Sequence, residues 1–79
     1  MTGRSMFDLG GRLCVVTGGG RGIGKSIAAA LAAQGGKVVV TGRSEETLRQ
    51  AVEEIRANGG SADWLTADIQ DEAAVIWLN

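Results

Sequence analysis

The sequence of 79 residues contains no proline, no histidine and no tyrosine, and it has a single cysteine. Without histidine, the chain itself offers no imidazole for acid/base catalysis or for metal ligation. Because Cys14 is its only cysteine, the chain can form neither an internal disulfide nor a zinc site built from several cysteines. Cys14 lies within an apolar run, so we expect a small buried side chain rather than a reactive thiol.

An excess of charge of one sign is also lacking, since 8 basic and 9 acidic side chains give a formal net charge of -1. A surface that binds DNA or RNA is rich in lysine and arginine, so we expect no nucleic-acid partner. The apolar stretches are far shorter than the roughly 20 residues of a membrane-spanning helix. The first eight residues also lack the basic and apolar segments of a secretion signal. We therefore expect a cytoplasmic chain with no membrane partner.

Glycine, by contrast, is abundant, with 13 residues, and it clusters where the hydrophobic pattern changes. Residues 13–17 form a continuous apolar run, typical of a strand that is buried on both faces. The glycine-rich residues 18–22 follow, and the apolar spacing is then helical over residues 23–34. Gly35 and Gly36 predict the end of this helix, because glycine tolerates the left-handed backbone of a C-terminal cap.

The same alternation of strand and helix then repeats. Residues 37–41 predict a second buried strand, and Ser44 is placed to cap the second helix, which the glycines after Asn58 end. Residues 62–67 predict a third strand, and residues 72–79 predict the first turns of a third helix. Strands that alternate with helices imply parallel pairing with right-handed crossovers. We therefore predict an α/β fold: the N-terminal β-α-β-α-β-(α) half of a Rossmann-type, doubly wound parallel sheet, in one truncated domain.

The glycine-rich segment fits two kinds of phosphate-binding loop. Gly19 to Ser26, G-G-R-G-I-G-K-S, satisfies the G-x-x-x-x-G-K-[ST] pattern of ATP- and GTP-binding P-loops, in which the lysine reaches the phosphates and the serine binds Mg²⁺. Alternatively, Gly18, Gly22 and Gly24 provide the tight turn, the close approach to pyrophosphate and the close helix packing of a dinucleotide loop. In both cases, the N–H groups at a helix N-terminus receive phosphate.

The second interpretation agrees with a known family. Thr17 to Gly24, T-G-G-G-R-G-I-G, fits every fixed position of the pattern T-G-x-x-x-G-[IL]-G and so resembles the short-chain dehydrogenase/reductase family. The resemblance covers about Phe7 to Val75 and is nearest to 3-oxoacyl-carrier-protein reductases and sugar or polyol dehydrogenases. It implies hydride transfer between a nicotinamide cofactor and a small-molecule carbonyl or alcohol, in a parent protein that forms a homo-oligomer. A P-loop module remains the alternative.

The end of the second strand indicates which cofactor is bound. An acidic residue there would hydrogen-bond the ribose 2′-hydroxyl of NAD, but this chain has Gly42 and Arg43, and no acid before Glu45. A guanidinium can hold a 2′-phosphate through two parallel hydrogen bonds. Arg21, in the loop itself, is placed to help. We therefore predict NADP as the cofactor, which agrees with the basic residues found at these positions in NADP-preferring members of the family.

The residues after the third strand complete the expected site. In the resembling family, an aspartate followed by an aliphatic residue holds the adenine ring, and Asp68-Ile69 match this pair. The same segment is a poor Mg²⁺-binding strand of a P-loop protein, because Thr66 interrupts its aliphatic run. Lys25 is then only an exposed helix residue. The predicted cofactor-binding residues are Gly18, Gly20, Arg21, Gly22, Ile23, Gly24, Arg43, Ser44, Asp68 and Ile69.

The residues that carry out the family's chemistry are absent from the chain. The acid/base group of the family is a tyrosine, assisted by a lysine four residues later and by a serine and an asparagine. The chain has no tyrosine, and its two lysines, Lys25 and Lys37, both lie in the nucleotide-binding half. We therefore predict no catalytic residue and no metal ligand, and we expect the 79-residue chain to be inactive on its own.

Overall fold

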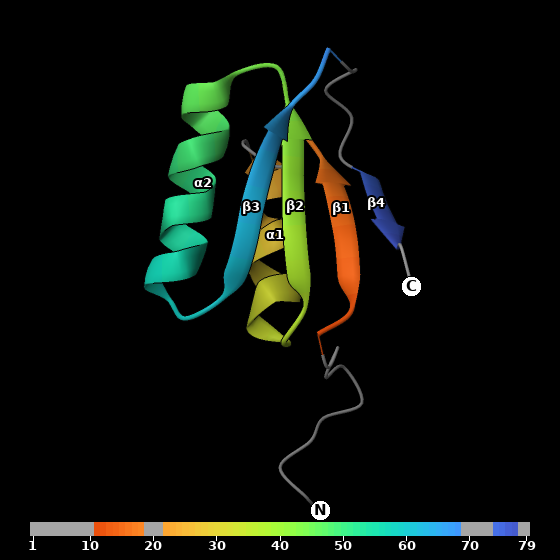
Figure 1. Cartoon of the computed structure of the whole chain (residues 1–79), viewed down its shortest axis with the longest axis vertical. Coiled ribbons are helices and arrows are strands. Elements are labelled where there is room, and N and C mark those ends of the chain that lie inside the picture. Colours follow the sequence, from red (N-terminus) through yellow and green to blue (C-terminus); the bar gives the residue numbers. More distant parts are fainter. Residues whose placement is uncertain (1–10, 19–21, 69–73, 78–79) are drawn as a thin grey trace, which may run out of the picture.

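A computed structural model of the chain describes residues 11–18, 22–68 and 74–77, and Figure 1 shows them as a sheet with helices packed against it. The first five elements occur in the predicted order, and each of their boundaries lies within one residue of the predicted position. The elements are β1 (Leu13–Thr17), α1 (Gly22–Ala33), β2 (Lys37–Gly42), α2 (Glu45–Ala57), β3 (Ser61–Thr66) and β4 (Ala74–Trp77).

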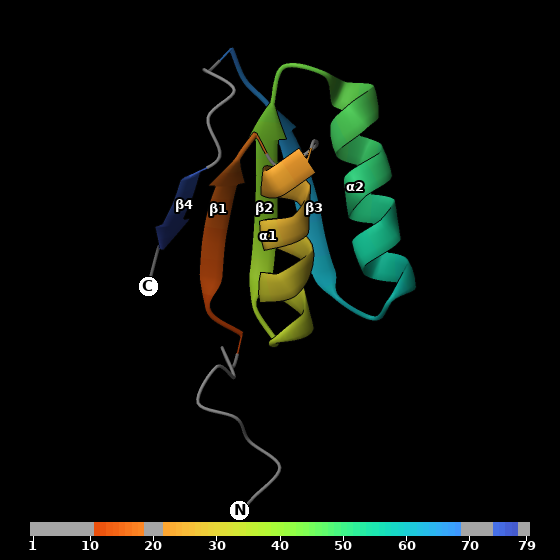
Figure 2. The same cartoon turned by 180° about the vertical axis from the view of Figure 1, so that it is seen from behind.

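The sheet has the strand order β3-β2-β1-β4, and its first three strands in the chain run parallel, as predicted. The first residues of these three strands are aligned, because Leu13 pairs with Lys37, and Lys37 pairs in turn with Ser61. Both connecting helices lie on the same face of the sheet (Figure 2). This is required because both crossovers are right-handed and both move the chain the same way across the sheet, from β1 to β2 and from β2 to β3. The carboxyl ends of β1, β2 and β3 therefore meet at one edge of the sheet.

The last described segment differs from the prediction. We predicted a third helix over residues 72–79, but Ala74–Trp77 forms strand β4, antiparallel to β1, and Figure 1 shows its arrow reversed. The segment reads Ala-Val-Ile-Trp, and β-branched and aromatic side chains favour a strand over a helix. β4 also satisfies backbone N–H and C=O groups that would otherwise lie on an open edge of β1. The expectation of an all-parallel sheet is therefore wrong at this edge.

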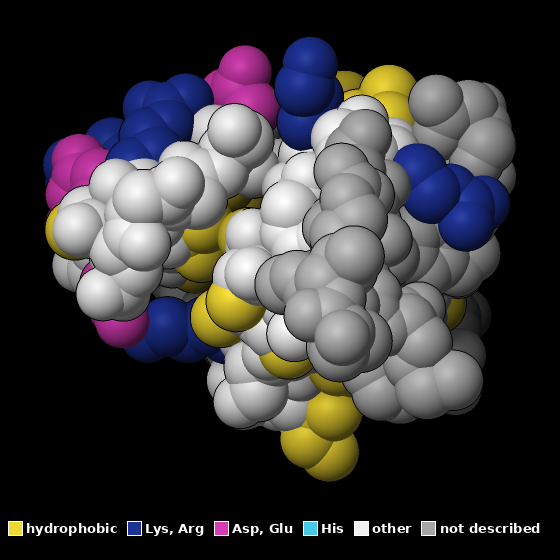
Figure 3. Space-filling model, turned by 90° about the horizontal axis from the view of Figure 1, so that it is seen from below, with side chains coloured by type: hydrophobic (Ala, Val, Ile, Leu, Met, Phe, Trp, Pro, Cys, Tyr) yellow, Lys and Arg dark blue, Asp and Glu magenta, His cyan; other side chains and the backbone are white. Residues whose placement is uncertain are grey.

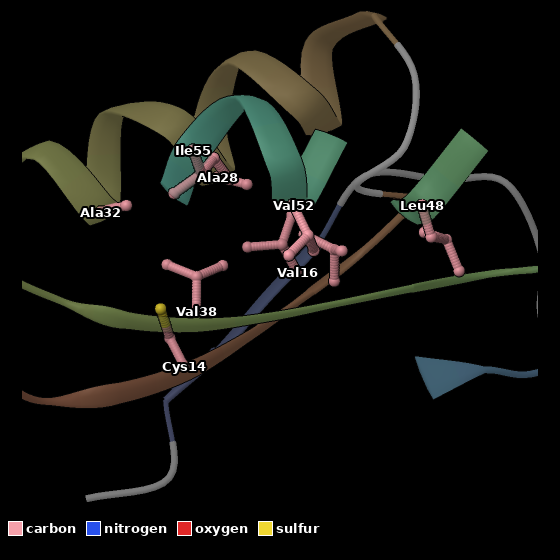
Figure 4. Close-up of a cluster of buried hydrophobic side chains, with 9 residues drawn as sticks. Cys14, Val16, Ala28, Ala32, Val38, Leu48, Val52 and Ile55 are labelled. Atoms are coloured by element: carbon pink, nitrogen blue, oxygen red, sulfur yellow. The ribbon is translucent and has the colours of Figure 1, made fainter. Parts of the chain in front are cut away.

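The hydrophobic core lies between the sheet and the two helices (Figure 4). Alternate side chains of a strand point to the same face, so β1 and β2 each place every second residue against the helices. The sheet contributes Cys14, Val16, Val38 and Val40, and the helices contribute Ala28, Ala32, Leu48, Val52 and Ile55. The predicted burial of Cys14 is confirmed, and this burial raises the pKa of its thiol because the thiolate is desolvated.

Local signals in the sequence set the ends of the helices. Ser44 caps α2 as predicted, since its Oγ accepts a hydrogen bond from the backbone N–H of Thr47 at 3.3 Å. Gly35 and Gly59 follow the two helices in the left-handed region, with φ angles of 93° and 87°. At Gly60 glycine is needed for space rather than for its backbone angle, because a Cβ atom there would lie 2.7 Å from the Cγ2 atom of Ile55.

The outer face of α2 carries alternating charges. Arg49 forms ion pairs with Glu46 and Glu53 on the same helix, at 3.5 and 3.0 Å. In the last turn, the Nη2 atom of Arg56 lies 3.7 Å from Oδ1 of Asp63 in β3. Figure 3 shows basic and acidic side chains interspersed on the α2 side of the molecule. Pairs of this exposed kind add only about 0–1 kcal/mol each, so the core rather than these charges holds α2 on the sheet.

One buried polar atom in β2 is unsatisfied. Thr41 is 6% exposed, and its hydroxyl oxygen has no hydrogen-bond partner. Because burying an unpaired hydroxyl is costly, we expect Thr41→Val to raise the free energy of unfolding by about 1 kcal/mol. Urea denaturation would measure this change. The matched control is Thr17→Val on β1, where the hydroxyl donates to the carbonyl of Ala74 at 3.4 Å; a gain as large in the control would contradict the explanation.

Candidate nucleotide-binding site

The candidate site lies at the edge of the sheet where the three parallel strands end. Two backbone hydrogen bonds extend the strand pairing beyond the strands: Gly18 N–H donates to the carbonyl of Thr41 at 2.8 Å, and Ala67 N–H donates to that of Gly42 at 2.7 Å. The segments that follow β1, β2 and β3 therefore leave the sheet from fixed, neighbouring positions. In open α/β sheets, ligands bind in the crevice outside these carboxyl ends.

The described ends of the turn between β1 and α1 are two glycines with left-handed backbone. Gly18 and Gly22 have φ angles of 67° and 45°, in the left-handed region that glycine adopts without strain. Gly24, in the first turn of α1, is buried and so allows close packing of the helix. That first turn holds no acidic side chain, whereas α2 begins with Glu45 and Glu46. The positive end of the α1 dipole is therefore not neutralised by its own helix.

A second part of the site follows β2 and β3. Arg43, Thr66, Ala67 and Asp68 line an open pocket of about 370 Å³, which lies within the usual size range of small-molecule sites. The Nε atom of Arg43 lies 3.8 Å from Oδ1 of Asp68, and the two side chains are 60% and 99% exposed. This pocket therefore presents a guanidinium and a carboxylate to the solvent, side by side.

Together these features fit the adenosine and phosphate parts of a dinucleotide. The glycine turn and the first turn of α1, which holds no acidic side chain, suit a pyrophosphate, because backbone N–H groups and the helix dipole both favour an anion there. The accessible guanidinium of Arg43 suits a further phosphate on the ribose. Asp68 offers a hydrogen-bond acceptor for an amino group such as that of adenine.

The predicted site residues fall into three groups. Gly18, Gly22, Ile23 and Gly24 lie at the β1–α1 turn, and Arg43, Ser44 and Asp68 lie beyond β2 and β3. Gly20, Arg21 and Ile69 lie outside the described residues. Ile23 is 75% exposed, whereas the hydroxyl of Ser44 already accepts the N–H of Thr47. Thr66 and Ala67, which we did not predict, also line the pocket, and their place directly before Asp68 is a signal for them.

Lys25, the lysine of the P-loop pattern, contacts the second helix. Its Nζ atom lies 2.6 Å from Oε2 of Glu54 and forms an ion pair that joins α1 to α2. Our prediction of a merely exposed residue missed this pair, because only the packing of the two helices brings these side chains together. In a P-loop the lysine instead reaches toward the phosphates. The position of its ammonium group therefore gives no support to the P-loop interpretation.

Two kinds of feature are absent from the described part of the chain. Within residues 11–18, 22–68 and 74–77, no group of three or more Cys, Asp or Glu side chains is placed to hold a metal ion. Neither of the two described helices is long and apolar enough to cross a membrane.

Comparison with known proteins gives a consistent result. The sequence profile of the short chain dehydrogenase family matches residues 12–78. A versicolorin reductase from Emericella nidulans is 43% identical over 79 residues, which cover 99% of this chain and 30% of the reductase.

Solved structures agree with the sequence matches. A 3-oxoacyl (acyl-carrier-protein) reductase from Agrobacterium tumefaciens, crystallised with NADP bound, superposes with a TM-score of 0.78 at 38% identity; the match covers 86% of this chain and 26% of that one. A metagenomic short-chain oxidoreductase in complex with NADP gives a TM-score of 0.76 at 46% identity, over 77% and 28% of the two chains. The chain therefore spans less than a third of each of these proteins.

Proposed function

Because this chain belongs to the short-chain dehydrogenase family, we propose that it is the NADP-binding portion of an oxidoreductase. The parent enzyme transfers a hydride between NADP(H) and the carbonyl or alcohol carbon of a small-molecule substrate. We propose further that the 79 residues are the N-terminal half of the nucleotide-binding domain, and that the parent is a cytoplasmic homo-oligomer. Since the chain spans under a third of the compared relatives, these statements concern the parent enzyme rather than the chain alone.

The observation that carries the choice of NADP is the position of Arg43. It follows β2 directly, lines the pocket with Asp68, and keeps an exposed guanidinium beside the carboxyl ends of the strands. A carboxylate at this point would favour the free ribose of NAD, whereas a guanidinium favours a 2′-phosphate. The relatives crystallised with NADP support the same choice.

We assign the remaining predicted residues to the other parts of the cofactor. The glycine turn would bind the pyrophosphate through its backbone, Arg21 would assist Arg43 at the 2′-phosphate, and Asp68 with Ile69 would hold the adenine. Bound NADP supplies the hydride-accepting nicotinamide. The chain has no tyrosine to exchange a proton with the substrate, so we expect no turnover by the chain alone. The full set comprises Gly18, Gly20, Arg21, Gly22, Ile23, Gly24, Arg43, Ser44, Asp68 and Ile69.

Calorimetric titration with NADP, NAD and Mg²⁺-ATP tests this proposal against the P-loop alternative. We expect the chain to bind NADP most tightly, and Lys25→Ala to leave that affinity within about twofold, because an exposed ion pair is worth little. Circular dichroism would confirm that the variant is folded. Mg²⁺-dependent binding of ATP that is lost in Lys25→Ala would instead assign Gly19 to Ser26 as a P-loop.

A further inference from the structure

The pocket beyond β2 and β3 is lined by Arg43, whose charge attracts an anion, and by Asp68, whose charge repels one. The Nε atom of Arg43 and Oδ1 of Asp68 are 3.8 Å apart, which is within ion-pair distance but beyond a good hydrogen bond. A phosphate that binds Arg43 comes close to the carboxylate of Asp68, because both face the same guanidinium. The site therefore brings two anions together at one cation when it binds a phosphorylated ribose.

The solvent around this pair determines the size of the effect. Asp68 is 99% and Arg43 60% exposed, so water and salt screen their interaction. Measured exposed pairs are worth about 0.2–1 kcal/mol, which corresponds to roughly 1.4- to fivefold in a binding constant. An effect of this size from Asp68 would weaken the binding of a phosphate at Arg43 without preventing it.

We propose that Asp68 limits the preference of this site for a 2′-phosphate, by placing a negative charge against the phosphate at Arg43. The inference rests on the proposed function, because it concerns the same adenosine site. Asp68 is thus a specificity-determining residue with two opposed effects. Its acceptor oxygen favours the adenine amino group of every adenosine ligand, whereas its charge disfavours only those ligands that carry a 2′-phosphate.

The two effects can be separated with a pair of ligands that share their adenine. Adenosine 2′,5′-bisphosphate and 5′-AMP differ only in the 2′-phosphate, so any loss of adenine contact affects both affinities and cancels in their ratio. The variant Asp68→Asn removes the charge and keeps the size of the side chain. We expect the ratio of the AMP dissociation constant to that of the bisphosphate to rise by about two- to fivefold at low salt.

The chain offers a closely matched control. Asp63 pairs with Arg56 at 3.7 Å, both side chains are largely exposed, and the pair lies at the opposite end of α2 from the pocket. Asp63→Asn therefore changes the net charge equally without touching the site, and we expect it to leave the ratio unchanged. Raising the salt concentration should shrink the effect of Asp68→Asn, because exposed charges are screened.

Calorimetry on the full 79-residue chain distinguishes the outcomes. A ratio that stays the same or falls in Asp68→Asn would overturn the inference, while a wild-type preference for the bisphosphate would still support the proposed function. An equal rise in Asp63→Asn would also overturn it, because net charge alone would then be sufficient. If the wild-type chain binds neither ligand, the 79 residues do not form an adenosine site on their own, and the inference is overturned whatever the parent enzyme does.

Discussion

Arg43→Ala is expected to lower the affinity of the chain for NADP by about tenfold while leaving the affinity for NAD nearly unchanged. Hydrogen bonds to charged groups contribute about 1.5–3 kcal/mol, or roughly 10- to 150-fold in a binding constant. We expect the lower end of this range, because the guanidinium is 60% exposed and water competes for it. Titration of both cofactors into the variant and the wild-type chain would measure the change.

Two further substitutions test whether the guanidinium itself is responsible. Arg43→Lys keeps the charge but loses the planar fork of donors, so we expect an intermediate affinity for NADP. Arg56→Ala removes an equal charge from the last turn of α2, away from the pocket, and should change neither affinity. If Arg56→Ala weakens NADP binding as much as Arg43→Ala does, the effect is one of net charge, and the assignment of Arg43 is wrong.

Leu48→Ala is expected to lower the free energy of unfolding by about 2–5 kcal/mol, the usual cost of a cavity left by a buried leucine. Leu48 is 1% exposed, and it packs directly beneath the end of β2, where its Cδ2 atom approaches Gly42. A chain of this length has a total stability of only roughly 4–12 kcal/mol. The melting temperature should therefore fall by about 8 °C or more, as circular dichroism would show.

Leu65→Ala provides the matched comparison, because it makes the same chemical change at a side chain that is 62% exposed. We expect it to cost less than about 1 kcal/mol, since no large buried surface is lost. Equal destabilisation by the two variants would show that the core does not lie between the sheet and the helices as described. Because Leu48 supports the strand end that precedes Arg43, its loss should also weaken NADP binding at temperatures where the variant is partly unfolded.

The sequence was sufficient to predict the first five elements because their signals are local. The change from continuous apolar runs to helical spacing marks each strand and helix, and glycine or Ser44 marks the ends. Strand β4 was not predicted, because its pairing depends on β1, which lies 57 residues away at the contact between Thr17 and Ala74. A four-residue apolar segment has no periodicity that distinguishes a strand from a helix.

In the candidate site too, the features that local sequence patterns encode were predicted, whereas a contact between distant residues was not. The glycines of the turn and Arg43 follow from their spacing along the chain, and the structure gathers their segments at one edge of the sheet. The contact of Lys25 with Glu54 joins residues that are 29 positions apart on different helices. No local pattern encodes such a pair, because it depends on how α1 and α2 lie on the sheet.

The antiparallel attachment of β4 has a consequence for the order in which the sheet assembles. Thr17 meets Thr41 of β2 across a loop of about 24 residues, but it meets Ala74 of β4 only after a loop of 57 residues closes. The longer closure costs about 0.8 kcal/mol more in chain entropy. Among the strands that the structure describes, β4 is also the shortest, so we expect it to dock last and to detach first. Each detachment exposes the edge of β1 and its unpaired backbone groups, which is the kind of surface that other strands recognise and that promotes aggregation.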